Sequence, residues 1–199
     1  MVEQIKTDQV IAKKHPYSPK PAIEEVFVGI KGEWQDTIIY KDGSKKVTTG
    51  TIKPNQIQNT FSTLLASLCK AESGYGALTY MAIGSGQVSW DSSTPSQPYA
   101  TTELETEYFR KAIDPADMIY IDPVTNISTG GTPSSKIEIA VTLESADAIG
   151  TMREFGLFGG TATTTLDSGE LVNWVVHNKV DKDTSVELQR IVRIEFVTR

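Results

Sequence analysis

The sequence predicts a mainly β protein: an antiparallel β-sandwich or barrel with one packed amphipathic helix and an extended N-terminal arm. Three observations support this fold class. Short segments that alternate apolar and polar residues recur along the 199 residues. Gly, Pro, Asn and Asp separate these segments at short intervals. Only one long segment places its apolar residues at helical spacing. Such a pattern is typical of strands packed in two layers, with the helix lying on a sheet.

Residues 1–22 are expected to form the arm, and residues 23–199 a single β-rich domain. The first segment is polar and contains Pro16, Pro19 and Pro21. Proline disfavours a helix both at its own position and at the residue before it. Two interpretations stay open for this segment: a terminus that binds nothing, or an arm that reaches a neighbouring subunit.

A β-hairpin is predicted in the first quarter of the chain. Trp34 and Tyr40 mark its first strand, and Val47 belongs to the return strand. Between them stands Asp42-Gly43, a turn signal, because glycine reaches a positive φ without steric cost.

The helix is predicted to begin after Asn55. Asn55 caps the helix, Gln58 bonds back from three residues further on, and Pro54 ends the preceding strand. Cys69 lies among apolar residues of the same segment, so its thiol is expected to be buried. One face of the predicted helix collects the apolar side chains of Ile57, Phe61, Leu64, Leu65 and Leu68.

The rest of the chain reads as strands joined by polar turns. A capping-box pattern at Thr102–Glu105 favours one helical turn before the next strand. The last two strands are expected to pair antiparallel across the turn "DKDTS" at 181–185. Beyond the hairpin, the predicted strands cover residues 26–30, 78–83, 107–113, 118–121, 137–143, 151–159, 169–180 and 187–197.

Composition and charge exclude several classes of function. The formal net charge of −6 argues against nucleic acid as the main partner, because phosphate binding needs a clustered cationic face. A single cysteine excludes an internal disulfide framework and a cysteine-based zinc site. No apolar run approaches the ~18 residues of a membrane span, and the N-terminus lacks the apolar core of a secretory signal. We therefore expect no membrane partner and synthesis in a cytoplasm.

Signatures of catalysis are sparse. His15 and His177 belong to no HxH or HExxH motif, and no serine stands in a GxSxG elbow. Glu103 and Glu105 belong to an acidic run for which glycoside hydrolysis or calcium binding are minor alternatives. The favoured interpretation is that the neighbouring Arg110 and Lys111 compensate these carboxylates. We expect no catalytic, cofactor-binding or metal-binding residues and no cofactor.

Four charged residues stand among apolar neighbours, where a charge needs a partner. They are Glu107 and Arg110 in "ETEYFRKAI", and Arg153 and Glu154 in "TMREFGLFGG". We expect structural ion pairs, with Glu107 bound to Arg153 or Arg110 bound to Glu154 across two strands. Replacing Arg153 or Glu154 by alanine is predicted to destabilise the fold.

An ordered set of motifs over residues 25–198 resembles a family of structural proteins of tailed phages and prophages. The resemblance begins with an apolar strand that ends in Gly-x-Gly, followed by a Leu-x-x-Glu-x-x-Arg element. An Arg-Glu-x-Gly-Leu-Phe strand, a Gly-x-Leu strand and a final strand after a Lys-x-x turn complete it. In this chain the motifs are Ile83–Gly86, Leu104 with Glu107 and Arg110, Arg153–Phe158, Gly169–Leu171, and Lys182 onward.

The resemblance implies a non-enzymatic virion component that assembles with other virion proteins at a tail, baseplate, fibre attachment or collar. It also implies a homo-oligomer, with a trimer as one candidate. The matched motifs end with the last strand, so an adaptor, collar or decoration protein is expected rather than a whole tail fibre. Capsid decoration is the first alternative. A carbohydrate-binding module is the second, with Trp90, Trp174 and Tyr99 as candidates for stacking on sugar rings.

Overall fold

The computed structural model describes residues 27–47 and 53–198. The expected arm, residues 1–22, lies outside the described residues. The described chain contains the strands β1 (Phe27–Tyr40), β2 (Lys45–Val47), β3 (Lys53–Ile57), β4 (Gly76–Gly84), β5 (Glu107–Ala112), β6 (Met118–Ile121), β7 (Lys136–Leu143), β8 (Gly150–Gly160), β9 (Glu170–Lys182) and β10 (Val186–Thr198). It also contains the helix α1 (Thr60–Cys69) and two short 3-10 helices, η1 (Val88–Asp91) and η2 (Pro115–Asp117).

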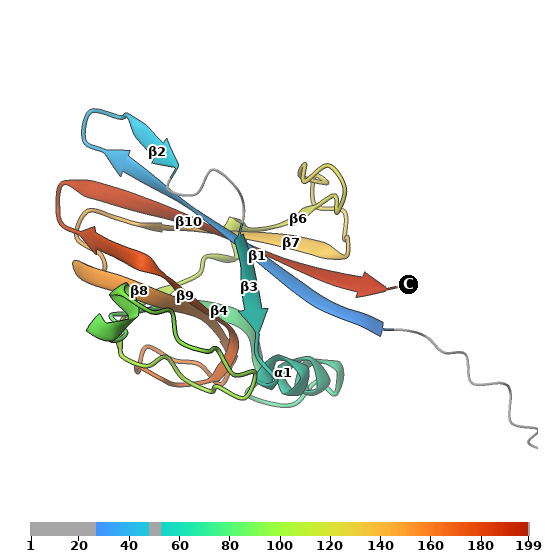
Figure 1. The fold of residues 1–199 in the computed structure, drawn as a ribbon. Helices are drawn as coiled ribbons and strands as arrows, with labels where there is room; N and C mark the ends of the chain where they lie inside the picture. The colour runs from blue at the N-terminus through green and yellow to red at the C-terminus, as the bar shows by residue number, and fades with distance from the viewer. Residues whose placement is uncertain (1–26, 48–52, 199) are drawn as a thin grey trace, which may run out of the picture.

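The strands form two antiparallel layers (Figure 1). One layer holds β1, β2, β10, β7 and β6, and the other holds β9, β8, β4 and β5 with the end of β3. The hydrogen-bonded order β5-β4-β8-β9-β3-β1-β10-β7-β6 begins and ends on different strands, so these residues form an open sandwich and not a closed barrel. The predicted fold class, mainly β with one helix, is confirmed.

Strand β3 joins the two layers and displaces the predicted start of the helix. Its first half pairs with β1, where Asn55 is the partner of Gly32, and its second half pairs with β9 through Gln56 and Ile57. Asn55, Gln56 and Ile57 therefore belong to a β-strand and cannot be part of the helix. The expectation that Asn55 caps the helix and Pro54 ends a strand is wrong, since α1 begins at Thr60.

The helix packs on the second layer through its first turns. Phe61 and Leu64 are buried, and Leu64 lies against Gly159 of β8. The ring of Phe61 also reaches the first layer, 6.0 Å from that of Phe196 on β10. Leu68 and Cys69 in the last turn are exposed. The expectation of a buried Cys69 thiol is therefore wrong, because burial ends before the end of the helix.

The hairpin at Asp42-Gly43 is confirmed. Tyr40 and Ser44 close it by a backbone hydrogen bond of 2.9 Å, and Gly43 adopts a φ of +80°. The expected helical turn at 102–105 is absent from the described structure. The backbone there bends around an acceptor on another strand, the carboxylate of Glu154, to which the N–H groups of Glu105 and Thr106 donate.

The last two strands do not pair with each other, which corrects the prediction made from the turn "DKDTS". β9 pairs with β8 and β3, whereas β10 pairs with β1 and β7. At the end of β9 the buried ammonium of Lys182 donates to the carbonyls of Glu144 and Asp147, at 2.6 and 2.9 Å. Asp183 closes the turn by accepting from the backbone N–H of Ser185. The turn thus links the two layers rather than two neighbours in one sheet.

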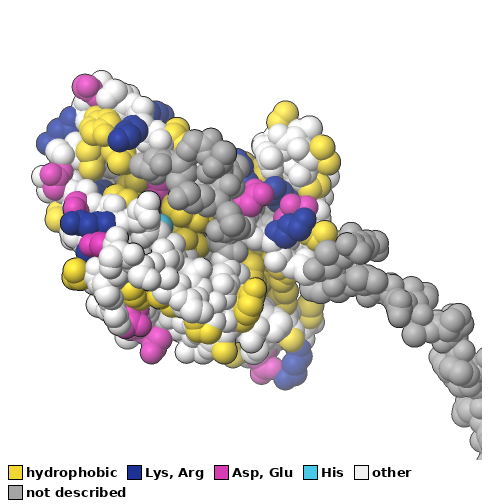
Figure 2. Space-filling model, in the orientation of Figure 1, with side chains coloured by type: hydrophobic (Ala, Val, Ile, Leu, Met, Phe, Trp, Pro, Cys, Tyr) yellow, Lys and Arg dark blue, Asp and Glu magenta, His cyan; other side chains and the backbone are white. Residues whose placement is uncertain are grey.

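Strand β6 and the connection that follows it form a projection, residues 118–131, whose tip stands away from the sandwich (Figure 1). Figure 2 shows hydrophobic side chains on its outer surface. Val124 and Ile127 at its tip are 87% and 67% exposed, and Ile119 and Tyr120 on β6 are also exposed. An apolar tip on a projecting connection is the kind of surface that contacts another protein.

Candidate functional site

Glu107 and Arg110 form a buried bidentate ion pair at the start of β5. Their contacts measure 2.6 Å from Arg110 Nε to Glu107 Oε1 and 2.8 Å from Nη2 to Oε2. The guanidinium also donates to the carbonyls of Thr163 and Ser168. The guanidinium carbon Cζ of Arg110 lies 4.4 Å from the ring centre of Phe158. The pair therefore fastens the 161–169 turn to the edge of the second sheet.

Glu154 is fully buried and is bound by hydrogen-bond donors rather than by a cation. The backbone N–H groups of Gly86, Glu105 and Thr106 donate to its carboxylate at 3.2, 3.0 and 2.9 Å. The indole Nε1–H of Trp174 donates at 2.8 Å. Such donors compensate a buried carboxylate for its lost hydration.

The glycines of the "GSG" motif make room for this arrangement. Gly84 is the β-ladder partner of Glu154, and a methyl group added there would overlap the Glu154 carboxylate. Gly86 has a φ of +54°, and a methyl group there would overlap the ring of Trp90. The motif therefore lets the backbone approach a buried side chain closely.

Arg153 holds η1 against β8. Its guanidinium binds Asp91 through two contacts of 2.7 and 2.8 Å and donates to the carbonyl of Ser85 at 3.1 Å. The hydrogen bond from Arg153 lowers the pKa of Asp91, and the same bond raises the pKa of Arg153. The loop that follows β4 is thereby tied to the sheet.

The four predicted residues are thus placed in one region, but the predicted pairs of Glu107 with Arg153 and of Arg110 with Glu154 do not form. The reason is topological. β4 lies between β5 and β8 in the sheet, and where the Glu154 carboxylate reaches past β4 it is already bound by the backbone N–H groups of Glu105 and Thr106. Each charge finds a partner nearer by: on its own strand, in η1, or among backbone N–H groups.

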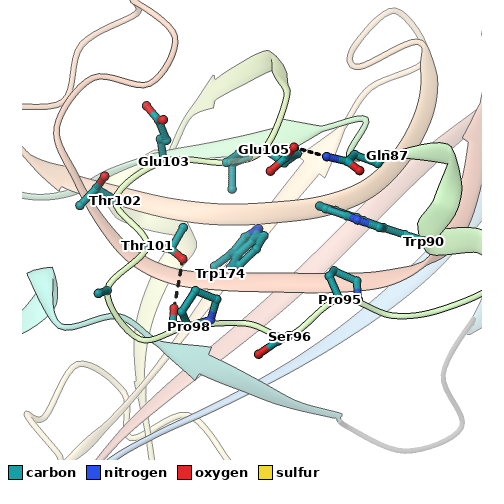
Figure 3. A pocket seen from close by; sticks show the side chains of 12 residues that line it. Gln87, Trp90, Pro95, Ser96, Pro98, Thr101, Thr102, Glu103, Glu105 and Trp174 are labelled. Carbon is teal, nitrogen blue, oxygen red and sulfur yellow. Dashed lines mark hydrogen bonds between the residues drawn. The ribbon is translucent and has the colours of Figure 1, made fainter.

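These contacts support the wall of a groove with a volume of about 770 Å³. It is lined by the segment between β4 and β5, which includes η1, and by one side chain of β9, Trp174. Figure 3 shows Trp174 between the segment that carries Pro95 and Pro98 and the segment that carries Glu103 and Glu105. Trp90 lies beside Trp174, with ring centres 6.3 Å apart and planes inclined at 64°. Of the predicted stacking residues, Trp90 and Trp174 line the groove, whereas Tyr99 does not.

The groove is acidic. Its lining residues include Glu103 and Glu105 and no Lys, Arg or His. The Glu105 carboxylate accepts a hydrogen bond from the side chain of Gln87, while the Glu103 carboxylate makes no hydrogen bond or ion pair with the described residues. An unpaired carboxylate beside aromatic walls favours a cationic or hydroxyl-bearing ligand and disfavours a phosphate.

A second buried ion pair was missed by sequence analysis. Asp36 on β1 and Arg190 on β10 are ladder partners, joined by contacts of 2.7 and 2.6 Å with both side chains fully buried. The guanidinium lies 4.0 Å from the ring centre of Phe155, and its Nη2 lies 3.2 Å from His177 Nε2. The signal was present in the alternation, which puts Asp36 in phase with the core residue Trp34.

Within the described ranges no group of three or more His, Cys, Asp or Glu side chains is arranged to hold a metal ion. No described helix is long and apolar enough to cross a membrane. No protein-family profile matches the chain. The curated proteins likewise include no match.

Proposed function

We propose that this protein is a non-enzymatic structural component of a tailed-phage virion, which assembles by protein–protein contacts at the tail, baseplate, fibre attachment or collar. The observation that carries the proposal is the exposed apolar tip of the 118–131 projection. Val124 and Ile127 expose large apolar side chains at the tip of the projection, whereas Ile121 at the end of β6 is buried in the core. Soluble monomers rarely expose apolar surface in contiguous patches, and such patches often mark contacts with other proteins.

The tip is held in a defined shape. Asp122 accepts backbone hydrogen bonds from Thr125 at 2.7 Å and Val124 at 2.9 Å, and a third bond from the Thr125 hydroxyl at 3.0 Å. The Thr125 backbone bond is the main cause of a lowered pKa for Asp122. A preshaped turn loses little conformational entropy when it docks.

The charged residues of the resemblance support a non-enzymatic role. Glu107, Arg110, Arg153 and Glu154 all bind other groups of the same chain, and together they hold the 161–169 turn, η1 and the 84–106 loop to the second sheet. The ion pairs and hydrogen bonds of these four side chains stabilise the fold. We propose a closed homo-oligomer, with a trimer as a candidate, because identical subunits usually assemble with closed symmetry.

The test combines location and assembly. Gold-labelled antibody against the chain is applied to intact phage particles and viewed by electron microscopy, for wild type and for a Val124→Ser/Ile127→Ser variant. We expect label at the tail, baseplate or collar of wild-type particles and loss of label from the variant. Ile149→Ser is the matched control, because Ile149 is 52% exposed but lies in the β7–β8 turn.

Three outcomes would change the proposal. Label spread over the head would favour capsid decoration, the alternative assignment. Absence of label from all particles would overturn a virion role. Retention of the double variant at the wild-type level would show that the 118–131 projection does not carry the contact.

A further inference from the structure

We propose that the acidic groove between Trp90, Trp174 and Glu103 is the docking site for the segment "KKHPYSPKPA", residues 13–22, of a neighbouring copy of the same chain. This inference rests on the proposed assembly function and deepens it by naming one contact between subunits. The segment lies outside the described residues, and its sequence is proline-rich and basic.

The walls of the groove match a proline-rich ligand. Trp90 supplies aromatic surface, Trp174 forms a mostly buried wall behind it, and Pro95 and Pro98 lie beside the two rings (Figure 3). Proline-rich peptides dock in aromatic-lined grooves, because their restricted backbone loses little entropy on binding. The segment carries Pro16, Pro19 and Pro21 within six residues, together with Tyr17.

The hydrogen-bonding groups match as well. A proline-rich backbone in extended form leaves its carbonyls without internal partners. The indole Nε1–H of Trp174 is already bound to Glu154, which fixes that ring. The indole Nε1–H of Trp90 makes no hydrogen bond with the described residues, so it remains a donor for a carbonyl of the ligand.

The positive charge of residues 13–22 is complementary to the negative charge of the groove, which distinguishes this segment from the rest of the chain. Residues 13–22 contain Lys13, Lys14 and Lys20 and no Asp or Glu, although the whole chain carries a net charge of −6. The groove presents Glu103 and Glu105 with no lining cation. Complementary charges of this kind speed encounter and fix orientation.

The groove is preorganised by the buried contacts behind it. Arg153 ties η1 to β8, and Glu154 binds the backbone of Glu105 and Thr106. A site that is already ordered keeps more of the interaction energy as affinity. Its volume of about 770 Å³ falls in the range of ligand sites and would hold part of the segment.

A neighbouring copy is the natural donor. Figure 1 shows β1 beginning on the side of the molecule that carries the C-terminus, with η1 on the opposite side. The six residues from Pro21 to Phe27 span at most roughly 20 Å when fully extended, which limits how far the end of the segment can reach in its own chain. A segment that comes from a second copy is not limited by its distance from the start of β1 in the chain that carries the groove.

The test uses the full chain and carbodiimide cross-linking, which joins a lysine to a carboxylate in direct contact. Copies labelled with ¹⁴N and ¹⁵N are mixed, unfolded and refolded together, cross-linked and digested for mass spectrometry. We expect mixed-isotope cross-links from Lys13, Lys14 or Lys20 to Glu103 or Glu105.

Affinity is tested by exchanging charges across the proposed contact. Sedimentation velocity should show self-association weakened by about tenfold in Glu103→Lys and in Lys20→Glu, with recovery when both are combined. Asp117→Lys is the control, because Asp117 is an exposed carboxylate on η2 outside the groove, and it should self-associate like wild type.

The other possible results contradict either the exchange between copies or the docking of the segment in the groove. Cross-links confined to one isotope would show that the segment binds its own chain and would overturn exchange. An oligomer without these cross-links would overturn the docking proposal and leave assembly through other surfaces standing. Failure of the proposed function itself is read separately, as absence of the protein from particles. Glycan binding that is lost in Trp90→Ala, without the cross-links, would make the groove a saccharide site instead.

Discussion

The indole Nε1–H of Trp174 donates to Oε2 of Glu154 over 2.8 Å, inside the protein. This bond joins β9 to a carboxylate that also binds the backbone of the loop before β5. One buried acceptor thus orders two strands and one wall of the groove. Its energetic role can be measured, since a carboxylate offers two acceptor oxygens and an amide only one.

Glu154→Gln is expected to destabilise the fold by about 2–4 kcal/mol, because the side-chain amide would face backbone N–H donors and leave some of them unpaired. The measurement is the free energy of unfolding in urea at neutral pH. Glu105→Gln is the control, since the Glu105 side chain is exposed, and it should change stability by less than about 0.5 kcal/mol. Equal stability of the two variants would contradict the role given to Glu154.

Gly84→Ala is predicted to cost about 1–3 kcal/mol, because the added methyl group displaces the Glu154 carboxylate from its donors. Gly76→Ala, at the other end of β4, is a matched control. A methyl group there meets its nearest atom at 3.6 Å, an ordinary contact. Thermal unfolding of both variants checks the prediction, and a Gly84→Ala melting temperature as high as that of Gly76→Ala would refute it.

Asp36→Ala should destabilise the protein by about 3–5 kcal/mol, since it leaves the fully buried guanidinium of Arg190 without its carboxylate. The exposed pair of Lys70 with Glu72 provides the comparison. Glu72→Ala is expected to cost less than about 0.5 kcal/mol. Urea midpoints of the two variants give the answer, and a small effect of Asp36→Ala would mean that Arg190 is stabilised by other groups.

Asp167→Asn is expected to raise the melting temperature at pH 7 by about 1–3 °C. Burial, followed by the nearby Glu107 carboxylate, raises the pKa of Asp167. A raised pKa in the folded state means that the contribution of Asp167 to stability is complete below its unfolded pKa and is lost as pH rises through its folded pKa. Asparagine also tolerates the positive φ of 57° at this position.

The advantage of Asp167→Asn should therefore disappear below about pH 4, where the wild-type carboxyl is protonated in both states. Melting curves from pH 3 to pH 8 measure this difference. An advantage that stays constant over the whole range would exclude ionisation of Asp167 as its cause. Asp117→Asn, at an exposed carboxylate, serves as the control.

Most strands and turns could be predicted from the pattern of neighbouring residues in the sequence. Alternation identified β7, and short apolar segments bounded by turn residues identified β4, β6 and β8 near their observed bounds. Asp42-Gly43 identified the β1–β2 hairpin. All these signals depend only on neighbouring residues. The start of α1 was predicted too early, after Asn55, because the prediction used only the neighbouring residues. The residues before Thr60 have a helical pattern, but pairing with β9 holds Gln56 and Ile57 in a strand.

Apolar surroundings also marked Glu107, Arg110, Arg153 and Glu154 as charges that need partners. Identifying those partners required the strand order, since β4 separates β5 from β8. Asp91 lies 62 residues before Arg153 in the chain, and no local signal connects them. The groove depends on the same long-range contacts.

The sequence by itself determined the fold class, the positions of most strands and the charges that had to be compensated, because hydrophobic alternation and turn chemistry act between near neighbours. Only the tertiary structure decided that β9 and β10 belong to different layers, that Glu154 is bound by donors instead of a cation, and that two tryptophans and two glutamates face one groove. These relationships come from strand pairing between distant segments, where the burial of whole faces outweighs the preference of any single turn.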